Sequence, residues 1–332
     1  MRSPATMNGR RRVLATLALG ALALPLGAFA QETKELPRVG YLVSQSPDYY
    51  FEVFQRHMRE LGYIDGRNVV FERRYAKGQL DRIPALVGEL IRQNVRVLVA
   101  PNNVAIEATR KANATMPVVM VASIDPVAAG YVATLARPGG NITGIANLNR
   151  DLSAKRIEML REIFPRLTRL AILWDADGPG PKVGIKNYER AAQASKIRVH
   201  SLPIQGPNPD LEGAFHAAKA GGAEVLLVIA NPMMSEHRAA VMALAQKHRI
   251  PVMAEHNPYL AAGALISYGA DHAKTAQRIA VYVDKILKGA KPADLPVEQP
   301  TTFELGLNLK TAGALDVKIP QSVLLRADKV VE

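Results

Sequence analysis

The sequence predicts an α/β protein in which two Rossmann-like, doubly wound parallel sheets form two lobes with a cleft between them. Short runs rich in Val, Ile and Leu alternate with helical patterns from Arg38 onward. The runs are almost continuously apolar, which is typical of parallel strands that are covered on both faces. They form two series of at least four strand–helix units, which is too many for one sheet of ordinary size.

The first series begins with a strand at 38–43. A helical face follows and stops at Gly62, a residue suited to a helix C-terminus. The remaining expected elements are a strand at 68–76, a helix around 83–91, a strand at 95–101, a helix at 104–112 and a strand at 117–123.

The stretch DPVAAGYVATLARPGGNITG, residues 125–144, separates the two series. Pro126 suits the first position of a short helix, and Asp125 suits the N-cap because its carboxylate can accept hydrogen bonds from backbone N–H groups. The run Arg-Pro-Gly-Gly at 137–140 would end this helix. A strand would then lead into the second lobe.

The second series begins with a helix at 154–164 and a strand at 169–177. The further expected elements are a helix at 185–195, a strand at 197–204, a helix at 211–222, a strand at 223–231, a helix at 236–249, strands at 250–256 and 263–270, and a helix at 273–288.

The N-terminus has the pattern of a secretory signal peptide. Basic residues up to Arg12 precede an apolar run, and Ala28-Phe29-Ala30 forms a small-residue cleavage site. The alternative is a membrane anchor, but Pro25 and two glycines interrupt the run. We expect removal of residues 1–30 and a mature chain that begins near Gln31. The three arginines at 10–12 fit either an ordinary charged segment or a twin-arginine signal.

Cysteine is absent, so the chain has neither disulfides nor a cysteine for a lipid anchor. A secreted chain of this kind is expected to be free in the periplasm. Four of the 42 Lys and Arg residues lie in the first 30 residues, which contain no acid, so the mature net charge is about +8. The basic residues are scattered and not clustered with aromatic residues, which argues against nucleic acid and leaves a weak bias toward anionic ligands.

Motifs for catalysis, metals and cofactors fail on spacing. No G-x-S-x-G or H-E-x-x-H occurs, and the glycines near 178–184 lack the spacing of a phosphate loop. A calcium loop that starts at Asp175 would need Glu where Lys186 stands. We therefore expect no enzyme activity, no metal and no cofactor.

Polar residues follow the expected strands of the first lobe. In open α/β sheets, ligands bind outside the carboxyl ends of the strands, and in a two-lobed protein both sets of ends can face one cleft. Hydroxyls, amides and helix N-termini are suited to a carboxylate. The candidates are Ser44, Gln45, Asn102, Asn103, Ser123 and Asp125. Each has helix capping as the alternative role, and Asp125 is expected to be structural.

The strand ends of the second lobe offer Trp174, Asp175, Asn231, Glu255 and Tyr268. Trp174 is the only tryptophan. It would either stack on a planar ligand or pack in the core. Glu255 would either receive an ammonium group or be a solvated loop carboxylate.

Three stretches resemble the family of ABC-transporter substrate-binding proteins that includes the TrpX-like proteins. They are 125–144, SAKRIEMLREIFP at 153–165, and the C-terminal region from SYGADHAKTAQRIAVYVDKILKG through LPVEQPTTFEL to IPQSVLLRADKVVE. The resemblance covers about Arg38 to Glu332. It implies a type I periplasmic-binding fold, three crossings between lobes, and hinge closure on a small molecule that is passed to a permease.

The resemblance also implies a domain division. Lobe 1 would comprise 37–145 plus about 270–292, and lobe 2 would comprise 146–269, while 293–332 is not assigned to either lobe. The crossings would lie near 141–149, near 268–270 and after Gly289, and Asn147 in the first of them joins the candidate ligand-binding residues. The protein is expected to be a monomer that meets an ABC permease at the inner membrane.

The resemblance implies amino acids, notably aromatic ones, or related small carboxylates as ligands. In relatives that bind amino acids we expect an acidic residue in the turn where this chain has Asn231-Pro232. That departure favours an aromatic or other small carboxylate without an amino group. Two other functions stay open: a sensory protein that presents its ligand to a membrane kinase, and an exported α/β enzyme.

Overall fold

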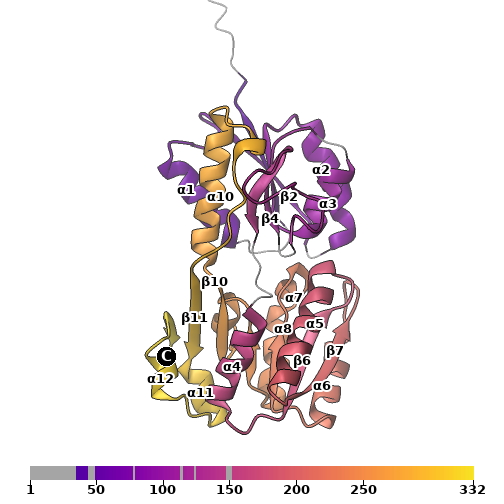
Figure 1. The fold of residues 1–332 in the computed structure, drawn as a ribbon, viewed down its shortest axis with the longest axis vertical. Coiled ribbons are helices and arrows are strands. Elements are labelled where there is room, and N and C mark those ends of the chain that lie inside the picture. The colour runs from indigo at the N-terminus through magenta and orange to yellow at the C-terminus, as the bar shows by residue number, and fades with distance from the viewer. Residues whose placement is uncertain (1–34, 44–48, 78, 113–114, 123–124, 147–151) are drawn as a thin grey trace, which may run out of the picture. The chain divides into compact units, whose positions relative to one another are not determined.

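The computed structural model describes residues 35–332 except 44–48, 78, 113–114, 123–124 and 147–151. The expected signal peptide, 1–30, lies outside the described residues. From Leu36 onward the chain forms one compact unit that contains two sheets with helices on both faces (Figure 1).

The first sheet has five parallel strands in the order β2-β1-β3-β4-β5. The central strands β3 and β4 are buried along their whole length, as the continuous apolar runs predict. The strands are β1 (Arg38–Val43), β2 (Val70–Tyr75), β3 (Val97–Ala100), β4 (Val118–Ala122) and β5 (Ile142–Ala146).

Helices cover both faces of the first sheet. On one face, α1 (Tyr49–Glu60) and α10 (His272–Leu287) lie side by side (Figure 1), and their apolar side chains join those of β1 and β3 in one core. On the other face, α2 (Ile83–Arg92), preceded by the 3₁₀ turn η1 (Leu80–Arg82), and α3 (Asn103–Lys111) enclose a second core. One face of the first sheet is therefore partly covered by α10, which begins more than 120 residues after the end of β5, the last strand of that sheet.

The second sheet repeats the strand order of the first. Its parallel strands run β7-β6-β8-β9-β10, and β11 and β12 extend it beyond β10. β11 is antiparallel to β10, with Tyr268 paired to Leu305, and β12 is parallel to β11. The strands are β6 (Arg169–Asp175), β7 (Arg198–Ile204), β8 (Val225–Val228), β9 (Val252–Ala254), β10 (Ile266–Ala270), β11 (Phe303–Asn308) and β12 (Lys329–Val331).

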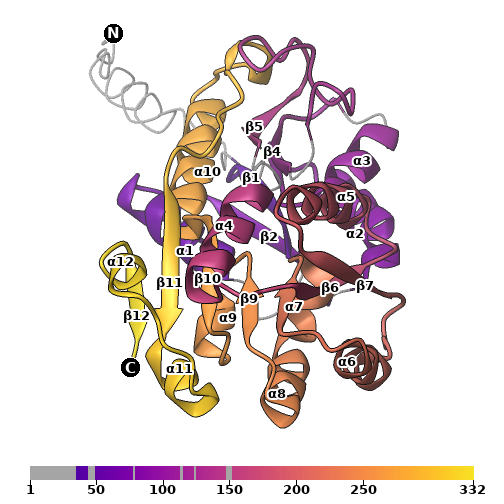
Figure 2. The same ribbon diagram turned by 60° about the horizontal axis from the view of Figure 1, so that its bottom comes forward.

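The second sheet also forms two hydrophobic cores with the helices that cover it. α4 (Ser153–Ile163), α5 (Pro179–Ala194) and α12 (Gln321–Leu324) contribute to one of them. The other core is shared by α6 (Leu211–Ala220), α7 (Pro232–Glu236), α8 (Arg238–His248) and α9 (Pro258–Ala261). Figure 2 shows α11 (Leu309–Leu315), α12 and β12 gathered near the C-terminus beside β11.

The prediction of a short helix after Asp125 is wrong. Asp125 does cap a turn, because its Oδ1 accepts hydrogen bonds from the N–H groups of Val127 (2.9 Å) and Ala128 (3.2 Å). The chain leaves that turn at Gly130, whose positive φ of 70° interrupts a right-handed helix. Further turns lead to β5.

The segment after α10 returns along the edge of the first sheet. Past the 3₁₀ turn η3 (Pro292–Asp294), the N–H of Glu298 donates to the carbonyl of Gly144, and the N–H of Ala146 donates to the carbonyl of Glu298. Thr143 donates its hydroxyl to the carbonyl of Leu295 at 2.5 Å. The chain then enters the second sheet, to which both β11 and β12 belong.

Gly144 allows β5 to lie against β4. Its φ of 132° is unfavourable for other residues, and a Cβ atom there would overlap the backbone of Met120. The glycine in the NITG stretch is therefore needed for strand packing at the edge of the first sheet.

Candidate functional site

The shared strand order gives each sheet a switch point, where successive connections leave in opposite directions. In the first sheet it lies between β1 and β3, and in the second between β6 and β8. Ligands of doubly wound sheets bind outside the carboxyl ends of the strands at this point. The residues there are Asn102 after β3, Asp175 at the end of β6 and Asn231 after β8.

At the first sheet, two of the three described candidates, Asn102 and Asp125, act as caps. Asn102 is the N-cap of α3, and its Oδ1 accepts a hydrogen bond from the N–H of Ala105 at 2.9 Å. Asn103 is buried at the first position of the helix. Asp125 caps its turn in the same way. The candidates Ser44, Gln45, Ser123 and Asn147 lie outside the described residues.

At the second sheet, Asp175 and Asn231 join β6 to β8 through their side chains. Asp175 is 1% exposed. Its Oδ1 accepts from the N–H of Asp177 at 2.9 Å, and its Oδ2 accepts from the Nδ2 of Asn231 in a short hydrogen bond. The Oδ1 of Asn231 accepts from the N–H of Met234 at 2.8 Å as the N-cap of α7. A buried carboxylate therefore lies at the switch point, directly beside the asparagine.

Glu255, after β9, is neither solvated nor free. It is 4% exposed, and its Oε1 lies 2.9 Å from the Nη1 of Arg156 on α4. The hydroxyl of Tyr188 on α5 donates to the same oxygen at 2.6 Å, and the N–H of Ala230 donates to Oε2 at 3.0 Å. Arg156 also donates its Nε to the carbonyl of Tyr268 at 2.7 Å. This network links α4 and α5 to β10 and to the ends of β8 and β9 around one buried ion pair.

The two buried carboxylates differ in their partners. Arg156 neutralises Glu255, whereas Asp175 forms no ion pair with any of the described residues. Burial raises the pKa of Tyr188 well above its usual value, so the phenol keeps its proton and serves as a donor. Asp175 is thus a buried carboxylate without a cationic partner among the described residues.

Arg156 and Tyr188 were missed by the sequence interpretation. Arg156 lies on the apolar stripe of α4 with Met159, Leu160 and Ile163, all buried. A charged residue on such a stripe is the signal that could have identified it, because a buried charge needs a partner. Tyr188 carried no comparable signal, since a buried tyrosine is ordinary.

Trp174 and Tyr268 contribute to the core. Trp174 is partly buried against the core beneath α4 and α5, and its Nε1 donates to the hydroxyl of Ser201 on β7 at 2.8 Å. Tyr268 packs on the same core, with its ring centroid 6.1 Å from that of Phe303. The alternative of core packing therefore describes Trp174 in this structure.

A cavity of about 360 Å³ lies where β5, the start of α10 and residues 298–302 meet. Ile145, Asp271 and Lys274 are among its lining residues, and Arg278 and Glu298 pair in its wall through two hydrogen bonds. It adjoins the edge strand of the first sheet, two strands from β3. We do not assign the solute to this cavity, because it is away from both switch points.

The sequence matches known proteins along most of its length. A family model described as ABC transporter substrate binding protein matches residues 42–331. The tyrosine-binding protein of Clostridioides difficile is 23% identical over 266 residues, which are 80% of this chain and 76% of that protein. Across the described residues, no helix is both long and apolar enough to span a membrane.

Solved structures share the fold. A conserved domain protein from Vibrio cholerae has a TM-score of 0.81 at 23% identity, over 90% of this chain and 100% of the other. The ABC domain in complex with L-Trp from Streptococcus pneumoniae has a TM-score of 0.82 at 23% identity, over 89% and 100%. The predicted fold class of two doubly wound parallel-sheet lobes is confirmed.

Proposed function

We propose, from the premise that the chain belongs to the ABC transporter substrate-binding protein family, that it is the solute receptor of an importer and binds an aromatic α-amino acid. The family match over residues 42–331 establishes the premise. It makes the chain a substrate-binding protein with a type I periplasmic-binding fold, and not an enzyme. The tyrosine-binding relative and the L-Trp complex support an aromatic amino acid as the solute.

The observation that carries this choice is the carboxylate of Asp175. It is buried at the switch point of the second sheet and has no cationic partner among the described residues. A buried charge is costly without a partner, and the ammonium group of an amino acid would provide one. The asparagine at 231 consequently does not remove the ammonium site, because its neighbour Asp175 offers the acid.

The first sheet offers the complementary group. α3 begins at the switch point after β3, and the partial positive charge of its N-terminus favours an anion. In the proposed complex, the α-carboxylate of the solute faces α3 and the α-ammonium group faces Asp175. Such a ligand contacts both sheets at once.

Hinge closure follows from a ligand that contacts both sheets, since it binds the closed form better and shifts the population toward it. The chain crosses between the sheets after Ala146, at Asp271 and after Glu298. In this proposal, residues 37–145 and about 270–292 move as lobe 1, and 146–269 with the strands from Phe303 onward move as lobe 2. The receptor is a periplasmic monomer, exported by its signal peptide, and delivers its solute to a permease at the inner membrane.

The test is a thermal-shift series with L-tryptophan, L-tyrosine and L-phenylalanine on the unmodified protein and on Asp175→Asn. A ligand at 100 times its dissociation constant adds about 2.7 kcal/mol to the free energy of unfolding. We expect the shift to require far more ligand in Asp175→Asn, because the variant loses the charge that holds the ammonium group.

Asp177→Asn is the matched control. Asp177 lies two residues after Asp175 in the sequence. It is exposed and accepts a hydrogen bond from the N–H of Gly206. This variant should bind as the unmodified protein does. Equal ligand response in Asp175→Asn and Asp177→Asn would reject Asp175 as the ammonium site.

A further inference from the structure

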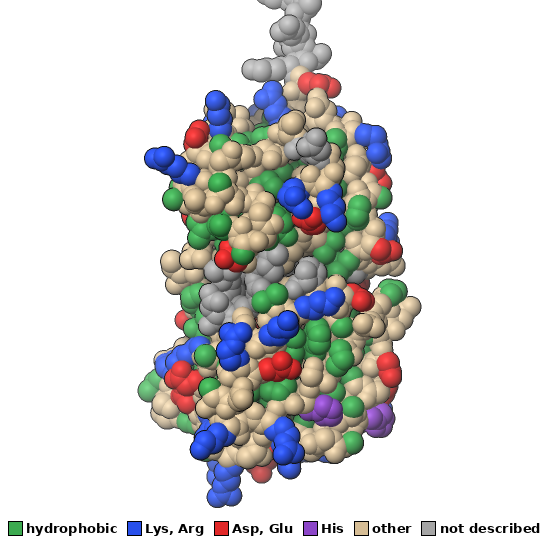
Figure 3. Space-filling model, turned by 45° about the vertical axis from the view of Figure 1, so that its right-hand side comes forward, with side chains coloured by type: hydrophobic (Ala, Val, Ile, Leu, Met, Phe, Trp, Pro, Cys, Tyr) green, Lys and Arg blue, Asp and Glu red, His purple; other side chains and the backbone are tan. Residues whose placement is uncertain are grey.

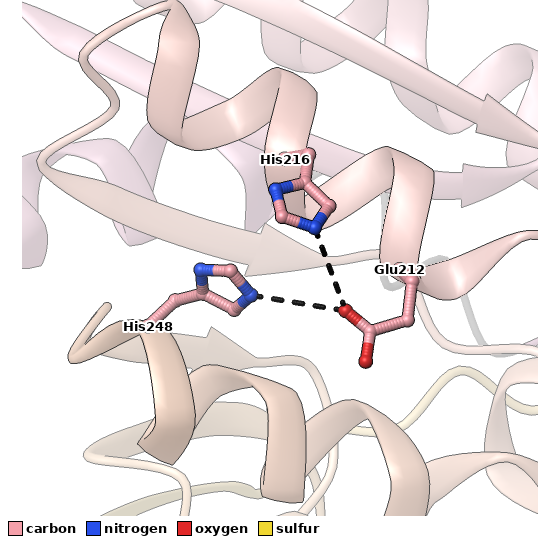
Figure 4. A group of neighbouring side chains, drawn as sticks. All are labelled: Glu212, His216 and His248. Carbon is pink, nitrogen blue, oxygen red and sulfur yellow. Dashed lines mark ion pairs between the residues drawn. The ribbon is translucent and has the colours of Figure 1, made fainter.

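Two histidines and a glutamate converge on the second sheet, away from the switch point. Glu212 and His216 lie one turn apart on α6, and His248 lies at the end of α8 (Figure 4). The Oε2 of Glu212 is 3.9 Å from the Nε2 of His216 and 3.9 Å from the Nε2 of His248. One ligand atom from each of the three lies within 4.8 Å of the others.

These separations suit a first-row divalent metal. Zinc binds imidazole nitrogen and carboxylate oxygen at about 2.1 Å, so two ligand atoms of a tetrahedral site lie about 3.4 Å apart. Side-chain rotations that move each ligand atom by up to about 0.7 Å would close the observed spacing to that of a tetrahedral site. Glu212 and His216 are exposed enough to allow it (53% and 71%). Positions i and i+4 share one helix face, so α6 presents two ligands side by side.

His248 is held in place by its neighbours. Its side chain is 12% exposed, and its ring stacks on Phe215 with centroids 5.8 Å apart. The ring of His216 meets it edge-on at 5.3 Å. The Nε2 atom of His248 is shielded from water and forms no hydrogen bond with the described residues. A nitrogen directed at a carboxylate without bonding to it is well placed to bind a cation between them.

Lys247 competes for the same carboxylate. Its Nζ binds the Oε1 of Glu212 at 2.9 Å and leaves Oε2 facing the histidines. The hydrogen bond from Lys247 lowers the pKa of Glu212, so this carboxylate is ionised at neutral pH. A metal at Oε2 would have an ammonium group close by, which weakens binding.

We propose that Glu212, His216 and His248 form a surface site for a borderline divalent cation such as Zn²⁺, independent of the solute site. Two imidazoles and one carboxylate favour Zn²⁺, Ni²⁺ or Cu²⁺ over Mg²⁺ and Ca²⁺, which prefer oxygen ligands. Three protein ligands leave a fourth position for water. Figure 3 shows histidine side chains at the surface of the molecule on the face drawn there.

The test is calorimetric titration of the purified, metal-free protein, without a histidine tag, with Zn²⁺, combined with the visible absorption of bound Co²⁺. We expect one Zn²⁺ per chain. Removal of a ligand should cost at least as much as loss of a partner around the ligands, which is about 10- to 100-fold in affinity. His216→Ala should therefore weaken binding at least about tenfold and abolish the Co²⁺ spectrum of the site.

His57→Ala is the matched control. His57 pairs with Glu60 at 2.7 Å but belongs to no three-ligand group in the described part of the chain. Lys247→Ala gives a change of opposite sign, because it frees both oxygens of Glu212 and should tighten binding.

Absence of Zn²⁺ binding to the unmodified protein would overturn the proposal. Equal affinity in His216→Ala and the unmodified protein, or equal weakening in His216→Ala and His57→Ala, would also overturn it. Because His216 lies on the exposed face of α6, the far-UV spectrum of His216→Ala should match that of the unmodified protein.

Discussion

The two sheets have the same strand order but differ at their carboxyl ends. At the first sheet, Asn102 and Asp125 accept hydrogen bonds from nearby backbone N–H groups. At the second sheet, Asp175 and Glu255 are buried, and side chains from several elements hold them. Two sheets of the same topology therefore hold the polar residues at their carboxyl ends in different ways: the first sheet by local capping, the second by a charged network between distant residues.

The largest expected effect comes from breaking the network of the second sheet. Arg156→Met removes the cation and leaves Glu255 buried and unpaired, which costs about 3–5 kcal/mol of the free energy of unfolding. Urea denaturation measures this loss. Arg278→Met is the control, because the pair of Arg278 with Glu298 is about 40% exposed on both sides and should cost about 1 kcal/mol or less. Equal losses of unfolding free energy in Arg156→Met and Arg278→Met would show that burying the ion pair of Arg156 and Glu255 does not make its loss more costly.

A pH effect of similar size is expected at His272, where α10 begins. Burial lowers its pKa to about 4 against the opposing charge of Asp271, and its ring contacts Tyr50 of α1 and His256 after β9. The unfolded chain binds this proton near pH 6.5 and the folded chain only near pH 4. Stability is therefore full above about pH 6.5 and falls by about 3 kcal/mol as pH decreases to 4.

Urea denaturation between pH 4 and 7 measures this slope. His272→Asn should flatten it, because the substitution removes the buried imidazole. Burial and the charges of His272 and Arg156 also lower the pKa of His256, so part of the slope should persist in His272→Asn. An unchanged slope in His272→Asn would contradict the assignment.

The edge of the first sheet gives the next effect. Gly144→Ala places a methyl group against the backbone of Met120 at a φ that alanine avoids, and should cost about 2 kcal/mol or more. Gly140→Ala, four residues earlier, meets no atom within 4 Å and should be nearly neutral. Thermal denaturation of both variants measures the difference. A neutral Gly144→Ala would mean that β5 can shift away from β4.

The last comparison concerns one residue type in the same role at both sheets, and its Asn102 variant gives the smallest effect. Asn102→Ala removes the cap of α3 and should cost about 1 kcal/mol. Asn231→Ala removes the cap of α7 and also a donor to buried Asp175, so it should cost about 1–3 kcal/mol more. Chemical denaturation of the two variants measures the difference. Equal losses of unfolding free energy would contradict the contrast between the carboxyl ends of the two sheets.

Local pattern predicted most of the architecture. The apolar runs at 38–43 and 117–123 became β1 and β4, because parallel strands buried on both faces need continuous apolar sequence. The strand β11 was not predicted, since its partner β10 lies more than 30 residues earlier and no local pattern indicates their pairing. The prediction of a helix after Asp125 was wrong because it relied on the capping residues Asp125 and Pro126. Gly130, whose φ is positive, ends the turn before a helix forms.

The site was less predictable than the fold. The pattern of strand ends placed Asp175, Asn231 and Glu255 among the expected site residues. The pairing of Glu255 with Arg156 spans 99 residues, and no local pattern encodes such a distance. The group of Glu212, His216 and His248 was missed for the same reason. The spacing of Glu212 and His216 is a helical signal, but His248 joins them only through the packing of α6 against α8.

The most direct test of the solute receptor is a calorimetric comparison of L-tyrosine with 3-(4-hydroxyphenyl)propionate, which lacks only the amino group. L-Tryptophan and indole-3-propionate form a second pair. If Asp175 receives the ammonium group, the amino acid of one pair binds and its partner without the amino group binds at least about tenfold more weakly, a difference of about 1.4 kcal/mol. Equal binding of both members of a pair would contradict the account.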